Sequence, residues 1–359
     1  MDNYEILKNR TSKRNRIYSH LDRIKKTFSQ EDCLAPITLE IFPTNRCNSK
    51  CYFCAYPKVD SDELSNSVFE SLINSCIKIG VKGITFSGGG EPTLHKYLPT
   101  AIDRLTEAGI SVGLITNGVY ISDELYKVVN KCSWIRFSLL TSQAKEYYAF
   151  TNLKEEIFDN VLKNIKRVTR NKKNLIVGAT MMLNDQNTNL DSIVSYLNLA
   201  SELELDQIFF TEMVDGIGNF KMKKDGMLQY LELIHAMSEE KRVVTNIDKF
   251  LSQENVVMSR KEKCPCDMIE RNLINVINAK GEVYPCLGQY TIEQAQPLGS
   301  LYQLTYENIV KKSNLDYMAE QYIANGCRFC KNSTTRKELD NYFTTKIEKH
   351  VRDFHVDFL

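Results

Sequence analysis

Three cysteines in one short segment are the residues of this chain best suited to do chemistry. Cys47, Cys51 and Cys54 follow one another in the spacing C-x3-C-x2-C. This spacing lets a single loop place three thiolates at three corners of a cubane iron–sulfur cluster, whereas a cluster held by protein alone has four thiolates. Three local ligands leave one iron open, and an open iron can bind a small ligand.

A glycine-rich segment is the second candidate for ligand binding. Gly88, Gly89 and Gly90 stand in a row and are followed by Glu91. Glycines allow the backbone to approach a ligand closely, and a carboxylate accepts charge-assisted hydrogen bonds from an ammonium group. In isolation three adjacent glycines indicate no more than a tight turn, so the weight of this segment depends on its place in the fold.

Alternating strand-like and helix-like patterns position both segments. From residue 36 to about residue 212 this alternation predicts an α/β fold with a parallel sheet. The predicted strands span residues 36–43, 82–87, 110–115, 134–139, 175–182 and 207–211, and the predicted helices span 64–79, 97–108, 121–131, 154–169 and 189–203. The cysteine segment, Glu91 and a turn at Asn117 then lie at the carboxyl ends of strands, where parallel folds bind ligands.

A three-cysteine loop after the first strand and a Gly-Gly-Glu loop after the second resemble the radical S-adenosylmethionine (radical SAM) enzymes. The resemblance implies a partial (β/α)6 TIM-like barrel, because six βα units are too few for a closed eight-stranded barrel. It also implies that a [4Fe–4S] cluster is held by Cys47, Cys51 and Cys54. The methionine ammonium of S-adenosylmethionine (SAM) would be held by Gly89, Gly90 and Glu91.

Three further positions match the cofactor site of the family. Phe53 is the aromatic residue before the third cysteine, Asn117 lies on the same rim, and Ser138 corresponds to a serine that the fourth strand presents to the cofactor. A simple turn at Asn117 and an ordinary strand serine at Ser138 are the structural alternatives. Many relatives have an aspartate two residues after that serine. This chain has Leu140 instead, so the polar contact is absent or comes from elsewhere. Gly178 is a candidate to lie under the adenine.

A second group of cysteines surrounds a predicted β-hairpin near the C-terminus. The hairpin joins residues 273–277 to 282–286 and turns near Lys280 and Gly281. This arrangement resembles the twitch or SPASM-like auxiliary-cluster domain that follows some radical SAM cores, in which Gly281 and Cys286 match a Gly-x4-Cys element. The resemblance implies a second [4Fe–4S] cluster, with ligands Cys286, Cys327, Cys330 and Cys266, and Cys264 as the alternative to Cys266. Structural zinc is the other common use of paired cysteines.

Length and composition fit a cytoplasmic protein with one large and one smaller domain. The chain has 359 residues, 43% hydrophobic and 25% charged, with a formal net charge of +1. This charge gives no general reason to expect nucleic acid or membrane binding, and no apolar stretch approaches the ~18 residues of a transmembrane helix. Disulfides are rare in the cytoplasm, so the grouped cysteines are expected to be metal ligands or redox groups. The predicted parts are a basic helical arm (1–35), a radical SAM core (36–250), the auxiliary-cluster domain (251–345) and a tail (346–359).

The resemblance implies a reaction and leaves the substrate open. An electron from a flavodoxin- or ferredoxin-type donor would cleave SAM to methionine and a 5′-deoxyadenosyl radical, which removes a hydrogen atom from the substrate. The first candidate outcome is oxidation or crosslinking of a peptide or protein side chain, supported by the auxiliary cluster. Oxidation or epimerisation of a small polar metabolite, such as an amino sugar or aminocyclitol, is an alternative, and RNA modification is a third. A non-catalytic iron–sulfur sensor belongs to another class. No further catalytic residue is assigned, although His95 lies close to the glycine loop.

Overall fold

The computed structural model describes most of the predicted core and part of the C-terminal region. The described residues are 20, 35–54, 56, 60–184, 186–212, 227, 229–247, 269, 271–290 and 295–311. The predicted N-terminal arm, apart from residues 20 and 35, and the predicted tail lie outside this set. Four candidate ligands of the auxiliary cluster also lie outside it: Cys264, Cys266, Cys327 and Cys330.

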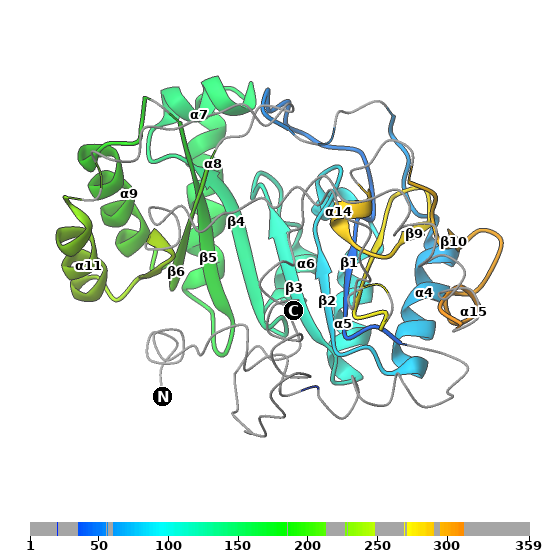
Figure 1. The fold of residues 1–359 in the computed structure, drawn as a ribbon. Coiled ribbons are helices and arrows are strands. Elements are labelled where there is room, and N and C mark those ends of the chain that lie inside the picture. The colour runs from blue at the N-terminus through cyan, green and yellow to red at the C-terminus, as the bar shows by residue number, and fades with distance from the viewer. Residues whose placement is uncertain are drawn as a thin grey trace, which may run out of the picture.

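Seven parallel strands form the larger part of one sheet and extend to one of its edges (Figure 1). They pair in chain order and are β1 (Thr38–Ile41), β2 (Gly83–Phe86), β3 (Ser111–Thr116), β4 (Trp134–Leu140), β5 (Ile176–Leu183), β6 (Gln207–Glu212) and β7 (Val244–Thr245). Every neighbouring pair in this run is parallel. The six predicted strands are therefore confirmed, and the two-residue β7 is an addition.

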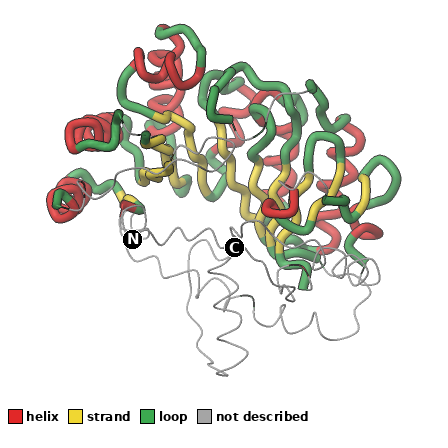
Figure 2. Tube along the Cα trace, turned by 45° about the horizontal axis from the view of Figure 1, so that its top comes forward, coloured by secondary structure: helices red, strands yellow, loops and turns green. Residues whose placement is uncertain are grey.

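Helices connect the strands and lie along the outer side of the sheet (Figure 2). They are α4 (Asn66–Ile79), α5 (Leu98–Glu107), α6 (Asp123–Val129), α7 (Ala144–Thr151), α8 (Glu156–Thr169), α9 (Leu190–Glu202) and α11 (Leu231–Glu240), with the 3-10 turn η1 (Pro92–Leu94) after β2. Ser65, Ser122 and Asn189 explain three of the starts, because each side chain accepts a hydrogen bond from the backbone N–H three residues later. The five predicted helices are confirmed, whereas α7 was not predicted.

The two faces of the sheet differ in polarity because successive side chains of a strand point to opposite sides. Leu39, Ile84 and Val177 are completely buried in the core that the helices cover. The opposite, inner face carries partly exposed polar side chains, among them Glu40 and Arg136. The hydrophobic core therefore lies between sheet and helices, and polar groups gather on the inner face.

The predicted C-terminal hairpin is present and belongs to the same sheet. It consists of β8 (Ile274–Ile277) and the antiparallel β9 (Glu282–Tyr284), with Gly281 at φ +74° in the turn. β8 pairs in parallel with β1, and the short β10 (Gly299–Ser300) pairs with β9. Two short helices, α14 (Leu287–Tyr290) and α15 (Tyr306–Ile309), complete this region. Among the described strands, β10 and β7 are the two edges and do not pair with each other, so the barrel is open.

Candidate functional site

The three-cysteine loop begins directly after β1. Cys47, Cys51 and Cys54 are partly exposed thiols on this loop. In the described part of the chain, no three His, Cys, Asp or Glu side chains gather closely enough to hold a single metal ion. A cubane does not need that arrangement, because each of its thiolates binds a different iron. In number, type and exposure, the three thiols suit three corners of such a cluster.

Helix α7, which was not predicted, supports this loop. The carbonyl oxygen of Thr151 accepts hydrogen bonds from Lys50 N at 2.9 Å and from Ser49 Oγ at 3.3 Å. Ser49 Oγ also lies 3.0 Å from Cys51 Sγ. One residue earlier in the helix, the ring of Phe150 meets Phe53 edge-on, with 6.2 Å between centroids. The C-terminal end of α7 thus fixes the cysteine loop by hydrogen bonds to the Thr151 carbonyl oxygen and by aromatic packing.

Leu140 occupies the position where the family pattern predicts an aspartate, and the structure gives it an apolar role. Its side chain is buried with Phe150, and Phe53 and Met182 pack against them. Leu140 has φ +62°, a left-handed conformation that is rare for leucine. The register between β4 and β5 shifts at this point. The predicted aromatic residue Phe53 therefore rests on an apolar cluster to which Leu140 belongs.

The glycine loop after β2 lies directly against the cysteine loop. Gly90 N donates to Thr44 O at 3.0 Å, and Glu91 N donates to Arg46 O at 2.8 Å. A Cβ atom at Gly90 would lie 2.2 Å from Arg46 O, so no larger residue fits without a backbone shift. Glycine is thus required here because two main chains touch, an arrangement that places the two predicted binding loops side by side.

The carboxylate of Glu91 ties these loops to the end of β3. Glu91 is only 3% exposed. Its Oε1 accepts from Thr93 N (3.1 Å), Thr93 Oγ1 (2.8 Å) and Thr116 Oγ1 (2.7 Å), and its Oε2 accepts from Asn117 N (2.7 Å). Burial raises the pKa of Glu91, and the four hydrogen bonds oppose that rise. The sequence did not reveal this bridging role. That Glu91 also contacts an ammonium group stays a prediction.

Asn117 joins the third strand to the cysteine loop, whereas Ser138 lies on the inner face of the sheet. Asn117 Nδ2 donates to Asn48 Oδ1 at 2.6 Å, and Asn117 Oδ1 accepts from Val119 N at 3.0 Å. Asn117 therefore makes the turn and also an interloop contact, for which Asn48 is a partner that the sequence did not single out. Ser138 is partly exposed and shares its side of β4 with Arg136. The role predicted for Ser138 in cofactor binding stays a prediction.

His95 is a structural residue beside this site. Its Nε2 lies 2.8 Å from Leu64 O, and its Nδ1 accepts from Tyr97 N at 3.2 Å. The ring is buried and meets Phe69 edge-on. Burial lowers the pKa of His95. A neutral ring that donates from Nε2 and accepts at Nδ1 satisfies both contacts, so His95 anchors the end of the cysteine loop.

Cys286, the one predicted auxiliary-cluster ligand among the described residues, begins the short segment that packs near the cysteine loop. It is partly exposed and precedes α14. The rings of Phe42, Tyr56 and Tyr290 contact one another, with centroids 5.4 to 5.9 Å apart. Phe42 follows β1, Tyr56 stands two residues after Cys54, and Tyr290 ends α14. This aromatic cluster connects the regions of the two predicted cysteine sites.

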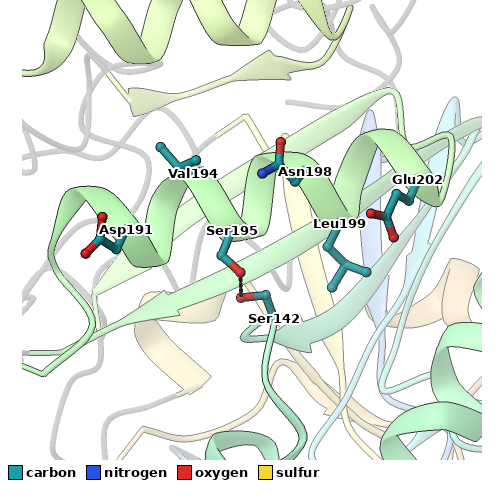
Figure 3. A pocket seen from close by; sticks show the side chains of 7 residues that line it. All are labelled: Ser142, Asp191, Val194, Ser195, Asn198, Leu199 and Glu202. Carbon is teal, nitrogen blue, oxygen red and sulfur yellow. Dashed lines mark hydrogen bonds between the residues drawn. The ribbon is translucent and has the colours of Figure 1, made fainter.

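A separate shallow groove of about 410 Å³ runs beside α9. Figure 3 shows Ser142, which follows β4, hydrogen-bonded to Ser195 of α9, and the two hydroxyl oxygens are 3.0 Å apart. Its other lining residues come from the same helix. The lining includes none of the predicted cysteine or cofactor residues, so the groove is distinct from the rim at β1 to β3.

Comparison with known proteins identifies the domain that carries this rim. Residues 41–197 match the Radical SAM superfamily. Over 140 residues the chain is 29% identical to a probable GTP 3′,8-cyclase of Pyrococcus horikoshii, which covers 38% of this chain and 44% of the relative. A GTP 3′,8-cyclase of Campylobacter jejuni is 24% identical over 263 residues, 69% of this chain and 79% of the relative. Residues 41–197 are therefore a radical SAM superfamily domain, although the chain spans less than half of the first of these relatives.

A solved structure supports the same fold. Streptococcus suis SuiB bound to its precursor peptide SuiA superimposes with a TM-score of 0.62 at 17% identity, covering 95% of this chain and 79% of that chain. The open parallel sheet predicted as a partial TIM-like barrel is thus confirmed. None of the described helices is both long and apolar enough to cross a membrane.

Proposed function

We propose that this protein is a radical SAM enzyme that cleaves SAM reductively and removes a hydrogen atom from its substrate. The observation that carries the proposal is the direct contact between three loops. The cysteine loop meets the glycine loop through Gly90 and Glu91, and both meet the end of β3 through Asn117. A superfamily match to the segment that contains all three loops supports it.

Each part of this rim has a proposed task. Cys47, Cys51 and Cys54 would hold a [4Fe–4S] cluster with one open iron, and the backbone around Gly89 and Gly90 would receive the methionine part of SAM. When bound, the cluster would pass to SAM one electron from a flavodoxin- or ferredoxin-type donor, which would split SAM into methionine and a 5′-deoxyadenosyl radical. The chain itself orients the two cofactors through Glu91 and Asn117. Phe53 shields the site with an apolar ring.

We further propose an auxiliary [4Fe–4S] cluster and a peptide or protein substrate. The auxiliary ligands would be Cys286, Cys327, Cys330 and Cys266, or Cys264 in place of Cys266. Four protein ligands favour a role in accepting an electron when a side chain is oxidised or crosslinked. SuiB, a fold neighbour, is bound to a precursor peptide in its solved structure, and this supports the peptide assignment. The predicted domain boundaries and a cytoplasmic location belong to the same proposal.

A small polar metabolite is the second candidate substrate. The inner face of the sheet carries charged groups: Glu40 Oε1 accepts from Ser87 Oγ at 2.6 Å, and the guanidinium of Arg136 lies 3.4 Å from the centre of the Phe209 ring. Polar groups fixed on a concave inner face suit a compact polar ligand. Two relatives of this chain bear names of nucleotide cyclases, which supports this candidate as well.

Anaerobic reconstitution tests the central proposal. The loaded chain should contain about eight irons if two cubanes are present. Replacement of Cys47, Cys51 and Cys54 by alanine should remove about half of that iron and all formation of 5′-deoxyadenosine. Reduced wild-type protein that binds iron but never yields 5′-deoxyadenosine, even slowly, would contradict the enzyme and favour an iron–sulfur sensor.

Label transfer decides between the two substrate classes. Deuterium from a labelled substrate should appear in 5′-deoxyadenosine during reductive turnover. Transfer from peptides but not from amino sugars or aminocyclitols supports the first candidate. The reverse pattern supports the second.

A further inference from the structure

A series of side-chain contacts links the C-terminal hairpin to the glycine loop. Lys280, in the turn between β8 and β9, forms an ion pair with Asp60, with 3.2 Å between Nζ and Oδ2. The other carboxylate oxygen of Asp60 accepts a hydrogen bond from Asn45 Nδ2 at 2.6 Å. Asn45 Oδ1 in turn lies against Gly89, since a Cβ atom there would be only 2.5 Å from it. The hairpin therefore reaches a predicted SAM-binding glycine through three side chains.

Asp60 determines which way the amide of Asn45 faces. The hydrogen bond from Asn45 lowers the pKa of Asp60, and an ionised carboxylate accepts hydrogen bonds but donates none. The NH2 group of Asn45 must therefore face Asp60, and its carbonyl oxygen faces Gly89. The backbone of Asn45 is held separately, because Asn45 N donates to Asp62 O at 2.7 Å. Asp60 thus fixes the side chain of Asn45 and leaves its main chain to other contacts.

The lack of a side chain at Gly89 has a physical reason in this contact. A methyl group at Gly89 would overlap the Asn45 side chain, whereas at Gly90 the conflict is with backbone atoms of Asn45 and Arg46. Gly90 therefore packs against a main chain, and Gly89 packs against a side chain. A side chain can rotate away unless it is held, so the support of Gly89 depends on what holds Asn45.

We propose that Asp60 and Lys280 are positioning residues for SAM binding. Asp60 holds the Asn45 amide against Gly89. The ion pair with Lys280 restrains Asp60. The inference rests on the proposed function, because it requires that the glycine loop receives the methionine part of SAM. The C-terminal hairpin thus contributes to the affinity for SAM, a task separate from holding an auxiliary cluster.

The expected size of the effect follows from the freedom that Asn45 would gain. Without its acceptor, the side chain populates roughly three staggered χ1 wells. If one of them supports Gly89, the binding-competent fraction falls to about one third, and the apparent Kd for SAM rises about threefold. Lys280 should matter less than Asp60, since its side chain is 51% exposed and exposed ion pairs contribute little.

The same two segments offer a matched control. Arg46, next to Asn45, pairs with Glu63, and Arg46 Nε donates to Glu63 Oε2 at 3.0 Å. This ion pair also joins the start of the cysteine loop to the segment that contains Asp60. The closest contacts of the loop glycines involve neither of its side chains. Glu63→Ala and Asp60→Ala therefore each remove one link between the same segments, and only the second link reaches the glycine loop.

The test measures the Kd for SAM by equilibrium dialysis on full-length, anaerobically reconstituted protein. We expect about threefold weaker binding in Asp60→Ala and no change in Glu63→Ala. Asp60→Asn should bind SAM like wild type, because its carbonyl oxygen can still accept from Asn45. Lys280 keeps a partner in that variant, since its Nζ already lies 3.7 Å from Asp62 Oδ2.

A double-mutant cycle separates positioning from a general loosening of the loop. Asn45→Ala removes the side chain through which Asp60 acts, so the addition of Asp60→Ala should weaken SAM binding no further. Iron content and the rate of 5′-deoxyadenosine formation at saturating SAM should equal those of wild type in Asp60→Ala, because the defect lies in binding alone.

Failure of the inference and failure of the proposed function give different results. Unchanged SAM affinity in Asp60→Ala, in protein that still forms 5′-deoxyadenosine, overturns the inference alone. Equal weakening in Asp60→Ala and Glu63→Ala overturns it too, as do additive losses in the double variant of Asn45 and Asp60. Wild-type protein that neither binds SAM nor forms 5′-deoxyadenosine overturns the inference together with the proposed function.

Discussion

Two glutamates at the same rim of the sheet join loops of neighbouring strands in different ways. Glu91 connects the loop after β2 to the end of β3, and it is almost completely buried. Glu146, at the start of α7, connects the loops after β4 and β5, because it accepts from Thr141 Oγ1 and from Asn187 Nδ2 (2.9 Å). Its side chain is partly exposed.

The two glutamates differ in whether their hydrogen-bond partners can reorient. Each oxygen of Glu91 is held by a backbone N–H, whereas both partners of Glu146 are side chains. A hydroxyl can reverse its hydrogen bond and an amide can turn over, but a backbone N–H can do neither. The cysteine side of the rim is therefore fixed before any ligand arrives. The β4–β5 side keeps partners that can rearrange.

Glu91→Gln should give the largest loss of stability. In either orientation the new amide NH2 faces a fixed backbone donor, from Thr93 or from Asn117. An unsatisfied buried donor costs about 1–3 kcal/mol, and because two donors oppose each other here the expected loss is about 3 kcal/mol. The free energy of unfolding, measured by urea denaturation before cluster loading, checks this value. If Glu91→Gln lost less unfolding free energy than Glu146→Gln, the cysteine side of the rim would not be the more rigid one.

Gly90→Ala should have the next largest effect. The added methyl would lie 2.2 Å from Arg46 O and 2.5 Å from Asn45 C, so two backbone segments must separate. Overpacking of this kind costs about 1–3 kcal/mol. It should also lower iron uptake at the cysteine loop, measured after reconstitution. Gly80→Ala is the control, because a Cβ there meets nothing within 4 Å while φ +73° still strains the backbone. Equal iron uptake in the two variants would exclude a role for loop contact.

Glu146→Gln should cost about 1 kcal/mol or less, since a neutral hydrogen bond contributes about that much. The amide oxygen can accept from Asn187, and the NH2 can donate to the Thr141 hydroxyl. Thermal and urea unfolding of the same protein preparations measure the change. A loss as large as that of Glu91→Gln would mean that the β4–β5 side is as rigid as the cysteine side.

Protonation of His95 should give the smallest effect. Because burial lowers the pKa of His95 in the folded protein, the unfolded chain binds this proton more tightly. The contribution of neutral His95 to the free energy of unfolding is therefore complete above about pH 6.5, the usual pKa of histidine. It declines as the pH falls below that value and through the lower pKa of the folded protein. Protonation removes only the acceptor at Nδ1 and leaves the bond to Leu64. Unfolding free energies of wild type and His95→Gln, compared across this range, should converge at acidic pH. Parallel curves would contradict the prediction.

Much of the fold could be predicted because its signals are local. Apolar strands that alternate with amphipathic helices define the parallel order, and turn residues such as Gly281 define the hairpin. Helix α7 was missed because it is only eight residues long and its first residue follows Gln143, which makes no side-chain cap. The pairing of β8 with β1 was missed because it joins segments far apart in the chain.

The candidate site was predicted by residue type, but its internal contacts were not. The spacing of the cysteines and the position of Glu91 after three glycines singled out two loops that lie side by side in the structure. The direction of the Glu91 side chain depends on Thr116, the last residue of β3, and on Asn117, which follows that strand. The periodicity of a sequence does not indicate which side chains in separate loops contact each other.

The pairing of β1 with β8 also sets an order of events during synthesis. Thr38 N and Phe42 N donate to Leu273 O and Ile277 O, so one side of the strand that carries the cysteine loop stays open until the ribosome has passed residue 277. An open strand edge invites pairing with other chains, and N-terminal segments emerge first. The nascent chain therefore exposes its three-cysteine loop beside an incomplete sheet, and that exposure ends only when the second half of the protein arrives.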